Sequence, residues 1–398
     1  MRKFLGLLVA VVISAAAALA VVRLVAPADG DSGVRRQLAY LRAELDSGAA
    51  EDAQQLFPEG YFFSYALYGL ASVDAGRLDD ARWALSRLES DAGRAPFTGE
   101  MVLQYGVFYR GWVNWLRGGI LARVPEAARD AAQVRAFDED SAAIAAAFDA
   151  SPTPFLASYP GQAWPVDSTV AVASLRLHDK LRTPAYDVTV IRWLANVQAR
   201  LDPATQLIPH TADADTGEPT SGAQGTSQSI INRFLPEIDP ELARQQYTRF
   251  RTWFLAAPLG LGPTVREHPV GTDGPSNVDS GPLVLGVSLS ATVVTIGAAK
   301  VHGDESLADG LARFGEVAGL PVYTPGTKRY AFGAAPVGDA FLAWSKSARP
   351  WVAAPAPPPE RVLSRWWQLP LLTFFLAAGL APWLLAAALR RRRSGGER

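Results

Sequence analysis

Two long apolar segments, one near each end of the chain, constrain every other interpretation of this sequence. The C-terminal segment, Trp366 to Leu389, begins with two tryptophans and is followed by four arginines, Arg390 to Arg393. It is long enough to cross a bilayer as a helix, tryptophan favours the membrane interface, and clustered arginine favours the cytoplasmic side. A buried helix of a globular domain would not end in four arginines. We therefore expect a transmembrane helix at 366–389 and a basic cytoplasmic tail at 390–398.

The N-terminal segment has two interpretations. Phe4 to Val22 is an apolar run without a charged residue and follows Arg2 and Lys3, so it too can span a bilayer. The small residues at 18–20 also fit a signal-peptide cleavage site. Residues 1–25 are therefore a signal anchor or a signal peptide, and Arg23 favours the anchor. Either way, the basic flanks lie inside, so the main domain is extracytoplasmic. Both termini are cytoplasmic if the segment is not cleaved, and the bilayer is then a partner through two helices.

Composition excludes several functions. The chain has 398 residues, a formal net charge of −1 and no cysteine, which excludes disulfides, thiolate metal sites and cysteine nucleophiles. Eight of the 38 basic residues flank the two apolar segments, which leaves the middle of the chain acidic and without a basic stripe for nucleic acid. Signature motifs of zinc proteases, P-loop NTPases, serine esterases and dinucleotide enzymes are also missing from the sequence. We expect no cofactor and no metal. The start of a calcium loop at 213–217 departs from the EF-hand pattern at its fifth and twelfth positions.

The middle of the chain is dominated by helical periodicity. About twelve segments show apolar residues at the helical period, and Asp239-Pro240 marks one helix start. Two loops rich in Gly, Pro, Thr and Asp interrupt them at 202–226 and 256–277, the first with an expected β-hairpin, and long loops of this kind are often functional. The expected helices are 34–47, 61–73, 78–88, 97–121, 125–148, 166–181, 186–201, 227–235, 239–255, 279–301, 306–317 and 337–346.

Consecutive helical hairpins form either a solenoid or a closed ring, and the lack of a fixed-length repeat disfavours the solenoid. Three junctions resemble those of the six-hairpin (α/α)6 toroids, the glycosidase-like architecture that polysaccharide lyases and the linalool dehydratase-like group also use: 164–167, 224–228 and 277–282. The resemblance covers roughly residues 35–348 and implies an all-α toroid at 30–348 with small β-hairpin insertions. The transmembrane helices flank it.

The segment 349–365 links this domain to the C-terminal helix. Its first part, Arg349 to Glu360, is rich in proline and predicts a semi-rigid polyproline II spacer. Such a spacer reaches at most roughly 35–40 Å at about 3.1 Å per residue. We expect it to hold the domain away from the membrane.

The best candidate for chemistry is the stretch from Tyr159 to Ser168, where aromatic residues precede Asp167 at a helix start. One interpretation is that Asp167 only caps its helix, and the other is that it is a catalytic acid or base. Asp279 follows Asn277 at a second expected helix start. Glycoside hydrolysis needs two carboxyl groups that flank the bond, so we expect Asp167 and Asp279 to act as acid and base.

Further candidates surround this pair. His210 lies in the first long loop, where it is either an acid–base group near neutral pH or an exposed spectator. Tyr105, Tyr159 and Trp164, with the other aromatics at 105–115, stack on sugar rings or pack in the core. Arg233 binds a substrate carboxylate or pairs with Glu237. The expected substrate-binding residues are Tyr159, Trp164, Gln228, Arg233, Asn277 and Tyr105.

These features favour a membrane-tethered, extracytoplasmic protein that acts on glycans of the cell envelope as a hydrolase or lyase. Two alternatives stay open: a non-catalytic envelope scaffold, and a dehydratase or isomerase of a small alcohol, which only the shared architecture supports. The sequence therefore leaves enzymatic activity undecided. A carbohydrate is the expected ligand, and no protein partner is indicated.

Overall fold

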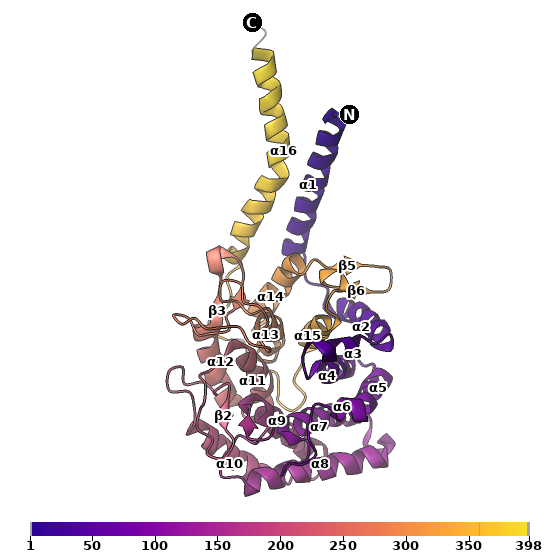
Figure 1. Ribbon diagram of the computed structural model, residues 1–398, viewed down its shortest axis with the longest axis vertical. Coiled ribbons are helices and arrows are strands. Elements are labelled where there is room, and N and C mark those ends of the chain that lie inside the picture. Colours follow the sequence, from indigo (N-terminus) through magenta and orange to yellow (C-terminus); the bar gives the residue numbers. More distant parts are fainter. Residues whose placement is uncertain (1, 358, 396–398) are drawn as a thin grey trace.

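The computed structural model describes residues 2–357 and 359–395, which form a helical domain between two projecting apolar helices (Figure 1). Short 3₁₀ turns and three two-stranded sheets connect the helices. The helices of the domain are α2 (Gly30–Asp46), α3 (Ala49–Leu56), α4 (Gly60–Asp74), α5 (Leu78–Leu88), α6 (Asp91–Arg94), α7 (Gly106–Ala122), α8 (Ala131–Ala150), α9 (Pro165–Leu181), α10 (Asp187–Gln198), α11 (Gly225–Ile238), α12 (Pro240–Phe254), α13 (Leu289–Val301), α14 (Glu305–Ala318) and α15 (Pro336–Ser347).

The helices of the described residues close into a ring. The inner helices α4, α7, α9, α11, α13 and α15 each pack against the next, and α15 returns to pack against α4. Helices α5, α8, α10, α12 and α14 each cover the inner helix that precedes them, and α2 covers α15. The predicted (α/α)6 toroid is therefore confirmed. The solenoid is excluded because its two ends would not meet.

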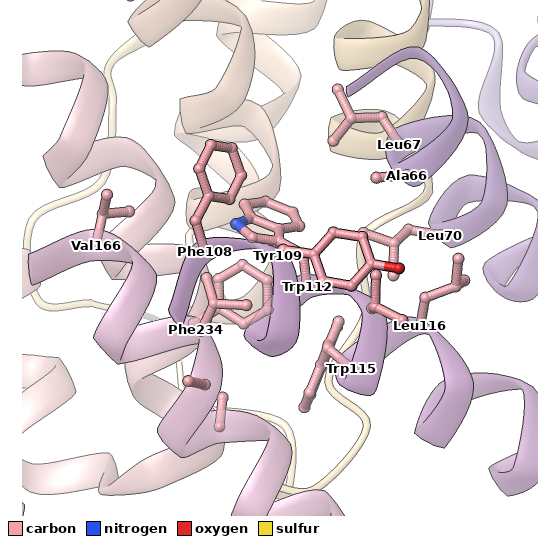
Figure 2. Close-up of a cluster of buried hydrophobic side chains, with 14 of the residues drawn as sticks. Ala66, Leu67, Leu70, Phe108, Tyr109, Trp112, Trp115, Leu116, Val166 and Phe234 are labelled. Carbon is pink, nitrogen blue, oxygen red and sulfur yellow. The ribbon is translucent and has the colours of Figure 1, made fainter. Parts of the chain in front are cut away.

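The inner helices are buried on nearly every side, and helices such as α4 and α7 are apolar or aromatic along most of their length. Figure 2 shows the result between α7 and α11, where the Trp112 and Phe234 rings meet edge to face at 5.5 Å. Phe108, Tyr109, Trp112 and Trp115 are all buried, so these aromatics of the 105–115 set pack in the core. Outer helices such as α14 bury only one face, as amphipathic surface helices do.

Neighbouring inner helices run parallel. A Cβ on Gly111 of α7 would lie 3.0 Å from Ala171 of α9. Two turns further along α7, a Cβ on Gly118 would lie 2.7 Å from Leu177 of α9. The same order of contacts links α4 to α7, where Phe63 meets Trp112 and, further along both helices, Gly69 meets Leu116. The inner helices therefore begin at one face of the ring, which we call the N-terminal rim, and end at the opposite rim.

Element boundaries depart from the sequence expectation in several places; α8, for example, begins at Ala131 instead of residue 125. Helix α13 begins at Leu289 instead of Asp279, because the Ser288 side chain caps it by accepting from the amide of Ala291. Helix α7 begins at Gly106 instead of residue 97, and α3 was not foreseen. The strands are β1 (Gln162–Ala163), β2 (Ala212–Asp213), β3 (Leu255–Ala256), β4 (Thr264–Val265), β5 (Val322–Tyr323) and β6 (Lys328–Arg329), paired β1–β2, β3–β4 and β5–β6.

The pairing of β1 with β2 matters for the site. The first long loop folds back on itself as the expected hairpin, since the amides of His210 and Asp213 donate to the carbonyls of Gly222 and Glu218. Its strand β2 also pairs with β1, where Ala212 lies opposite Ala163. This sheet fastens the loop that carries His210 to the segment that precedes α9. The sheet thereby joins the segments that carry two candidates, Asp167 and His210, which are far apart in the sequence.

The expected spacer is wrong for residues 349–353, which pack across the opposite rim of the ring. The Trp351 ring stacks on Trp115 at 4.7 Å and 8°, and its indole N–H donates to Oδ1 of Asp74 at 2.8 Å. The buried carboxylate of Glu237 accepts from the three backbone amides of residues 351–353. A buried tryptophan and a carboxylate that binds the backbone fix this segment to the domain, where a solvated polyproline segment would be free.

The two apolar helices are α1 (Arg2–Val25) and α16 (Leu369–Gly395), the latter preceded by η4 (Arg365–Gln368). Both are long and apolar enough to cross a membrane. They pack against each other: Ser14 Oγ donates to the carbonyl of Gly379, and the Trp383 indole donates to Ser14 Oγ, each at 2.8 Å. The end of the predicted basic tail, residues 396–398, lies outside the described residues.

Candidate functional site

Asp167 occupies the first turn of α9 at the N-terminal rim, and its carboxyl is buried. Its Oδ2 accepts a 2.6 Å hydrogen bond from Oγ of Ser158. Trp164 holds the N-cap position of α9, and no side chain caps that helix end. The interpretation of Asp167 as a helix cap is therefore wrong, and its carboxyl faces the segment before the helix.

Burial, together with the negative charges of Asp279 and Glu59, raises the pKa of Asp167 to about 7. The Ser158 hydroxyl and the nearby Trp112 indole oppose this shift, although the Trp112 N–H makes no hydrogen bond of ordinary geometry. A carboxyl with this pKa keeps a proton near neutral pH, as a general acid must.

Asp279 lies in the loop between β4 and α13, so its predicted position at a helix start is wrong. An Asn277 turn shapes the loop: Asn277 Oδ1 accepts from the amide of Ser280 at 2.7 Å. The Asp279 side chain is 54% exposed, yet protein encloses its other sides. This partial burial and the charge of Glu59 raise the pKa of Asp279 to about 6. The shift is smaller than at Asp167 because water reaches the carboxylate.

Glu59, which the sequence reasoning missed, immediately precedes α4 and accepts a hydrogen bond from the hydroxyl of Tyr159. The half-buried Tyr159 ring stacks on Phe97 at 5.9 Å and meets Trp164 edge to face at 5.7 Å. Burial and the bond to Glu59 raise the pKa of Tyr159 well above its usual value. Tyr159 and Trp164 thus form an aromatic wall beside the carboxyl groups.

His210 is buried, so the exposed-spectator interpretation is wrong. Its Nδ1 lies 2.5 Å from Oγ of Ser227, in the first turn of α11, and its Nε2 lies 4.0 Å from Oδ2 of Asp279. Burial lowers the pKa of His210 to about 4, and the charge of His268 adds to this. The imidazole is neutral near pH 7, so one ring nitrogen can donate a hydrogen bond while the other accepts one.

Glu267 is a further buried carboxyl that the sequence reasoning missed. It accepts from the hydroxyl of Thr226 at 2.7 Å and from the Thr226 amide at 3.3 Å, at the start of α11. Burial raises the pKa of Glu267 to about 7, and the charge of Asp279 adds to the shift. Nothing in its local sequence distinguishes it from a surface glutamate.

The other predicted ligand-binding residues hold the loops in place. Asn277 donates from Nδ2 to Oε1 of Gln224 at 2.7 Å, which ties the two long loops together. Gln228 is fully buried and donates to the carbonyl of Ile208 at 2.6 Å, so it positions the chain before His210 instead of reaching a ligand.

Among the described residues, two predicted binding residues make no hydrogen bond or ion pair with these carboxyl groups. Tyr105 occupies the N-cap position of α7 and packs beside Tyr109, with the guanidinium of Arg94 5.8 Å from its ring. Arg233 lies far along α11 towards the opposite rim and is 2% exposed. Its Nη1 lies 3.9 Å from Oε1 of Glu237, so the predicted salt bridge is confirmed and the binding of a substrate carboxylate at the site is wrong.

We call the group of Glu59, Asp167, Glu267 and Asp279 the carboxyl cluster. Among residues 2–357 and 359–395, no Lys or Arg forms an ion pair with a member of the cluster, and His210 is the single basic side chain near Asp279. The same residues contain no group of side chains arranged to hold a metal ion. Like charges without a cation favour protonation of some members, as the raised pKa values indicate.

Two hollows elsewhere in the structure, of about 400 and 450 Å³, lie at the opposite end of the ring. One runs beside Pro350 and Pro355, and the other beside Asp74 and Arg349. Neither contains a member of the carboxyl cluster. We place the candidate site at the carboxyl cluster because its members affect one another's pKa values and because water reaches Asp279.

No family model matches the chain, and no curated protein matches it. Among solved structures, a glycoside hydrolase from family 105 of C. acetobutylicum ATCC 824 is similar at 12% identity and a TM-score of 0.48. The match covers 77% of this chain and 98% of that one. The toroid assignment rests on the ring packing described above.

Proposed function

We propose that this protein is a membrane-tethered hydrolase of glycans, with Asp167 as general acid and Asp279 as general base. The observation that carries the proposal is the pairing of a buried carboxyl with a water-accessible one whose charge raises the first one's pKa. Two carboxyl groups in such different environments are the usual basis of acid and base roles in glycoside hydrolysis. The aromatic wall of Tyr159 and Trp164 offers a sugar ring an apolar surface.

The proposed reaction uses one water molecule. Asp167 gives its proton to the glycosidic oxygen as the bond between that oxygen and the anomeric carbon breaks. Asp279 takes a proton from the attacking water, whose oxygen bonds to the anomeric carbon. The neutral His210 beside Asp279 positions that carboxylate or the water. Both carboxyl groups return to their starting states when the proton on Asp279 passes to Asp167 through solvent.

The geometry favours this proposal over the scaffold. In a scaffold, each aspartate is expected to cap its own helix. Instead, Asp167 accepts a hydrogen bond from Ser158, and Asp279 lies in a loop. A lyase would place a cation beside the sugar carboxylate, and no Lys or Arg in the described ion pairs reaches the carboxyl cluster. No observation favours the dehydratase. The two apolar helices support the membrane tether.

The test uses the full-length protein in detergent and a panel of envelope oligosaccharides, with reducing ends measured over time. We expect Asp167→Asn and Asp279→Asn each to lower kcat by about 10²–10⁴-fold, the usual contribution of a general acid or base. Asp215→Asn, at an exposed position in a loop, is the matched control and should retain full activity. Unchanged rates in both site variants would overturn the assignment.

A further inference from the structure

We propose that the toroid rests directly on the bilayer through two exposed leucine-tipped loops, at Leu259 and Leu320, instead of standing away from it. The inference rests on the membrane tether of the proposed function and is independent of the hydrolase activity. It is motivated by where these two loops lie relative to α1 and α16.

The first loop contains η2 (Pro258–Gly260) and touches the start of α16. A Cβ on Gly260 would lie 3.5 Å from Cγ of Pro370, in the first turn of that helix. Leu259 at the tip is 82% exposed, and Leu261 beside it is 38% exposed. An apolar tip therefore flanks the point where α16 would enter the membrane.

The second loop follows α14 and touches the end of α1. Nη2 of Arg23 donates to the carbonyl of Pro321 at 2.9 Å, and the neighbouring Leu320 is 51% exposed. Tyr323, at the end of β5, is 44% exposed. A second apolar tip thus flanks the other apolar helix.

Helix α14 contacts the end of α1 and the segment that leads into α16, so both apolar helices leave the domain beside it. Arg313 donates to the carbonyls of Val25 and Ala26, after the last turn of α1. On the other side, Ser306 accepts from the amide of Leu363, which leads into η4. Figure 1 shows α1 and α16 leaving together from the end of the domain that carries α14, β5 and β6, with α8 and α10 at the far end.

The side chains at this level suit a membrane interface. Trp366 is 75% exposed, and Arg361 and Arg365 beside it are exposed. Tryptophan and arginine concentrate at the headgroup level of a bilayer, and exposed leucines gain from immersion just below it. The two tips adjoin the end of α1 and the start of α16, which commits this surface to lipid, whereas a protein partner would have no reason to contact both of these points.

The test exploits the absence of cysteine from the chain. Single variants Leu259→Cys and Leu320→Cys carry an environment-sensitive fluorophore in the full-length protein, reconstituted in vesicles of phosphatidylcholine and phosphatidylglycerol. A quencher is attached to part of the lipid, near the headgroup in one set of vesicles and near the end of the acyl chain in another, the second set serving residue 380. Val188→Cys, 75% exposed on the far helix α10, is the matched control, and Leu380→Cys on α16 reports the tether.

We expect blue-shifted emission and at least twofold quenching by the labelled lipid at residues 259 and 320, and neither effect at residue 188. Quenching at residue 380 without quenching at 259 and 320 would overturn the proposal while leaving the tether intact. An unquenched label at residue 380 overturns the tether and the proposal together. A blue shift at 259 and 320 that depends on protein concentration and not on lipid assigns the surface to a second copy of the chain, which also overturns it.

Discussion

Oγ of Ser158 donates a 2.6 Å hydrogen bond to Oδ2 of Asp167, so the candidate acid is bound by a side chain outside its helix. A donor to the carboxylate favours its charged form and lowers its pKa. Ser158→Ala should therefore raise the pKa of Asp167 above about 7 and move the alkaline limb of the pH–rate profile upward. The measurement is kcat/KM against pH, with the exposed Ser86→Ala as control. A limb that stays in place would separate Asp167 from the acid role.

Glu59→Gln should have the opposite effect. The charge of Glu59 raises the pKa of both Asp167 and Asp279, so its removal lowers both. We expect both limbs of the pH–rate profile to move to lower pH, by about half a unit to one unit for a charge that is partly screened by water. Glutamine can still accept the bond from Tyr159, which keeps the local packing intact. Limbs that move apart or upward would contradict the electrostatic coupling of these three groups.

The same burial predicts how stability depends on pH. The pKa of Asp167 rises from its ordinary value to about 7 in the folded protein, so the folded state binds more protons between about pH 4 and 7. The contribution of Asp167 to stability is therefore fully present below pH 4 and is lost as pH rises through 7, by at most about 4 kcal/mol at 1.36 kcal/mol per pKa unit. Asp167→Asn should flatten this loss, which chemical denaturation at several pH values can measure.

Two buried histidines change the stability with pH in the opposite direction from Asp167. The wild-type protein must therefore be compared with Asp167→Asn to isolate the effect of the aspartate. Burial lowers the pKa of His210 to about 4 and that of His302 to about 3. The unfolded chain then binds more protons than the folded one below about pH 6.5, so these histidines make the fold more stable as pH rises towards that value. The difference between the wild-type and variant curves isolates the aspartate, because both proteins share the histidines. A constant difference between pH 4 and 7 would contradict the raised pKa.

Local signals predicted much of the fold. Helix α5 has the bounds that its periodicity and acidic first turn indicated, and Asp239 caps α12 through a 2.7 Å bond to the amide of Leu242. Ring closure followed from the alternation of helices and from the lack of a fixed repeat. The helix bounds and the Asp239 cap depend on residues a few positions apart, which the sequence displays directly.

The site was only partly predictable because its members meet through long-range contacts. Asp167 and Asp279 were found as carboxyl groups near aromatic or Gly-rich junctions, and His210 as a histidine in a polar loop. Glu59 and Glu267 were not, because only the closed ring and the folded loops bring them to the N-terminal rim. Helix periodicity also cannot show that a Ser288 cap delays the start of α13.

The sequence did not predict that residues 349–353 bind to the ring, because this binding also depends on long-range contacts. These contacts support another prediction. Proline content indicated a free spacer, but Trp351 inserts beside Trp115 and donates to Asp74. Trp351→Ala should lower the free energy of unfolding by about 3–5 kcal/mol, the usual cost of removing a buried tryptophan. Thermal or denaturant unfolding of the full-length protein in detergent measures this. Val362→Ala, at a 66% exposed position of the same segment, should change stability by less than about 0.5 kcal/mol.

The exposure of Asp279 carries the last prediction, which concerns stereochemistry. An inverting hydrolase leaves space for a water between its carboxyl groups, about 6.5–9.5 Å apart, whereas a retaining enzyme places its nucleophile about 5 Å from the acid. Water reaches Asp279, whose side chain is 54% exposed, and His210 stands beside it, which suits a base that activates water. The first product seen by proton NMR should therefore have the anomeric configuration opposite to that of the substrate. Retention, together with a covalent adduct on Asp279, would make this residue a nucleophile and place the attacking water elsewhere in the cleft.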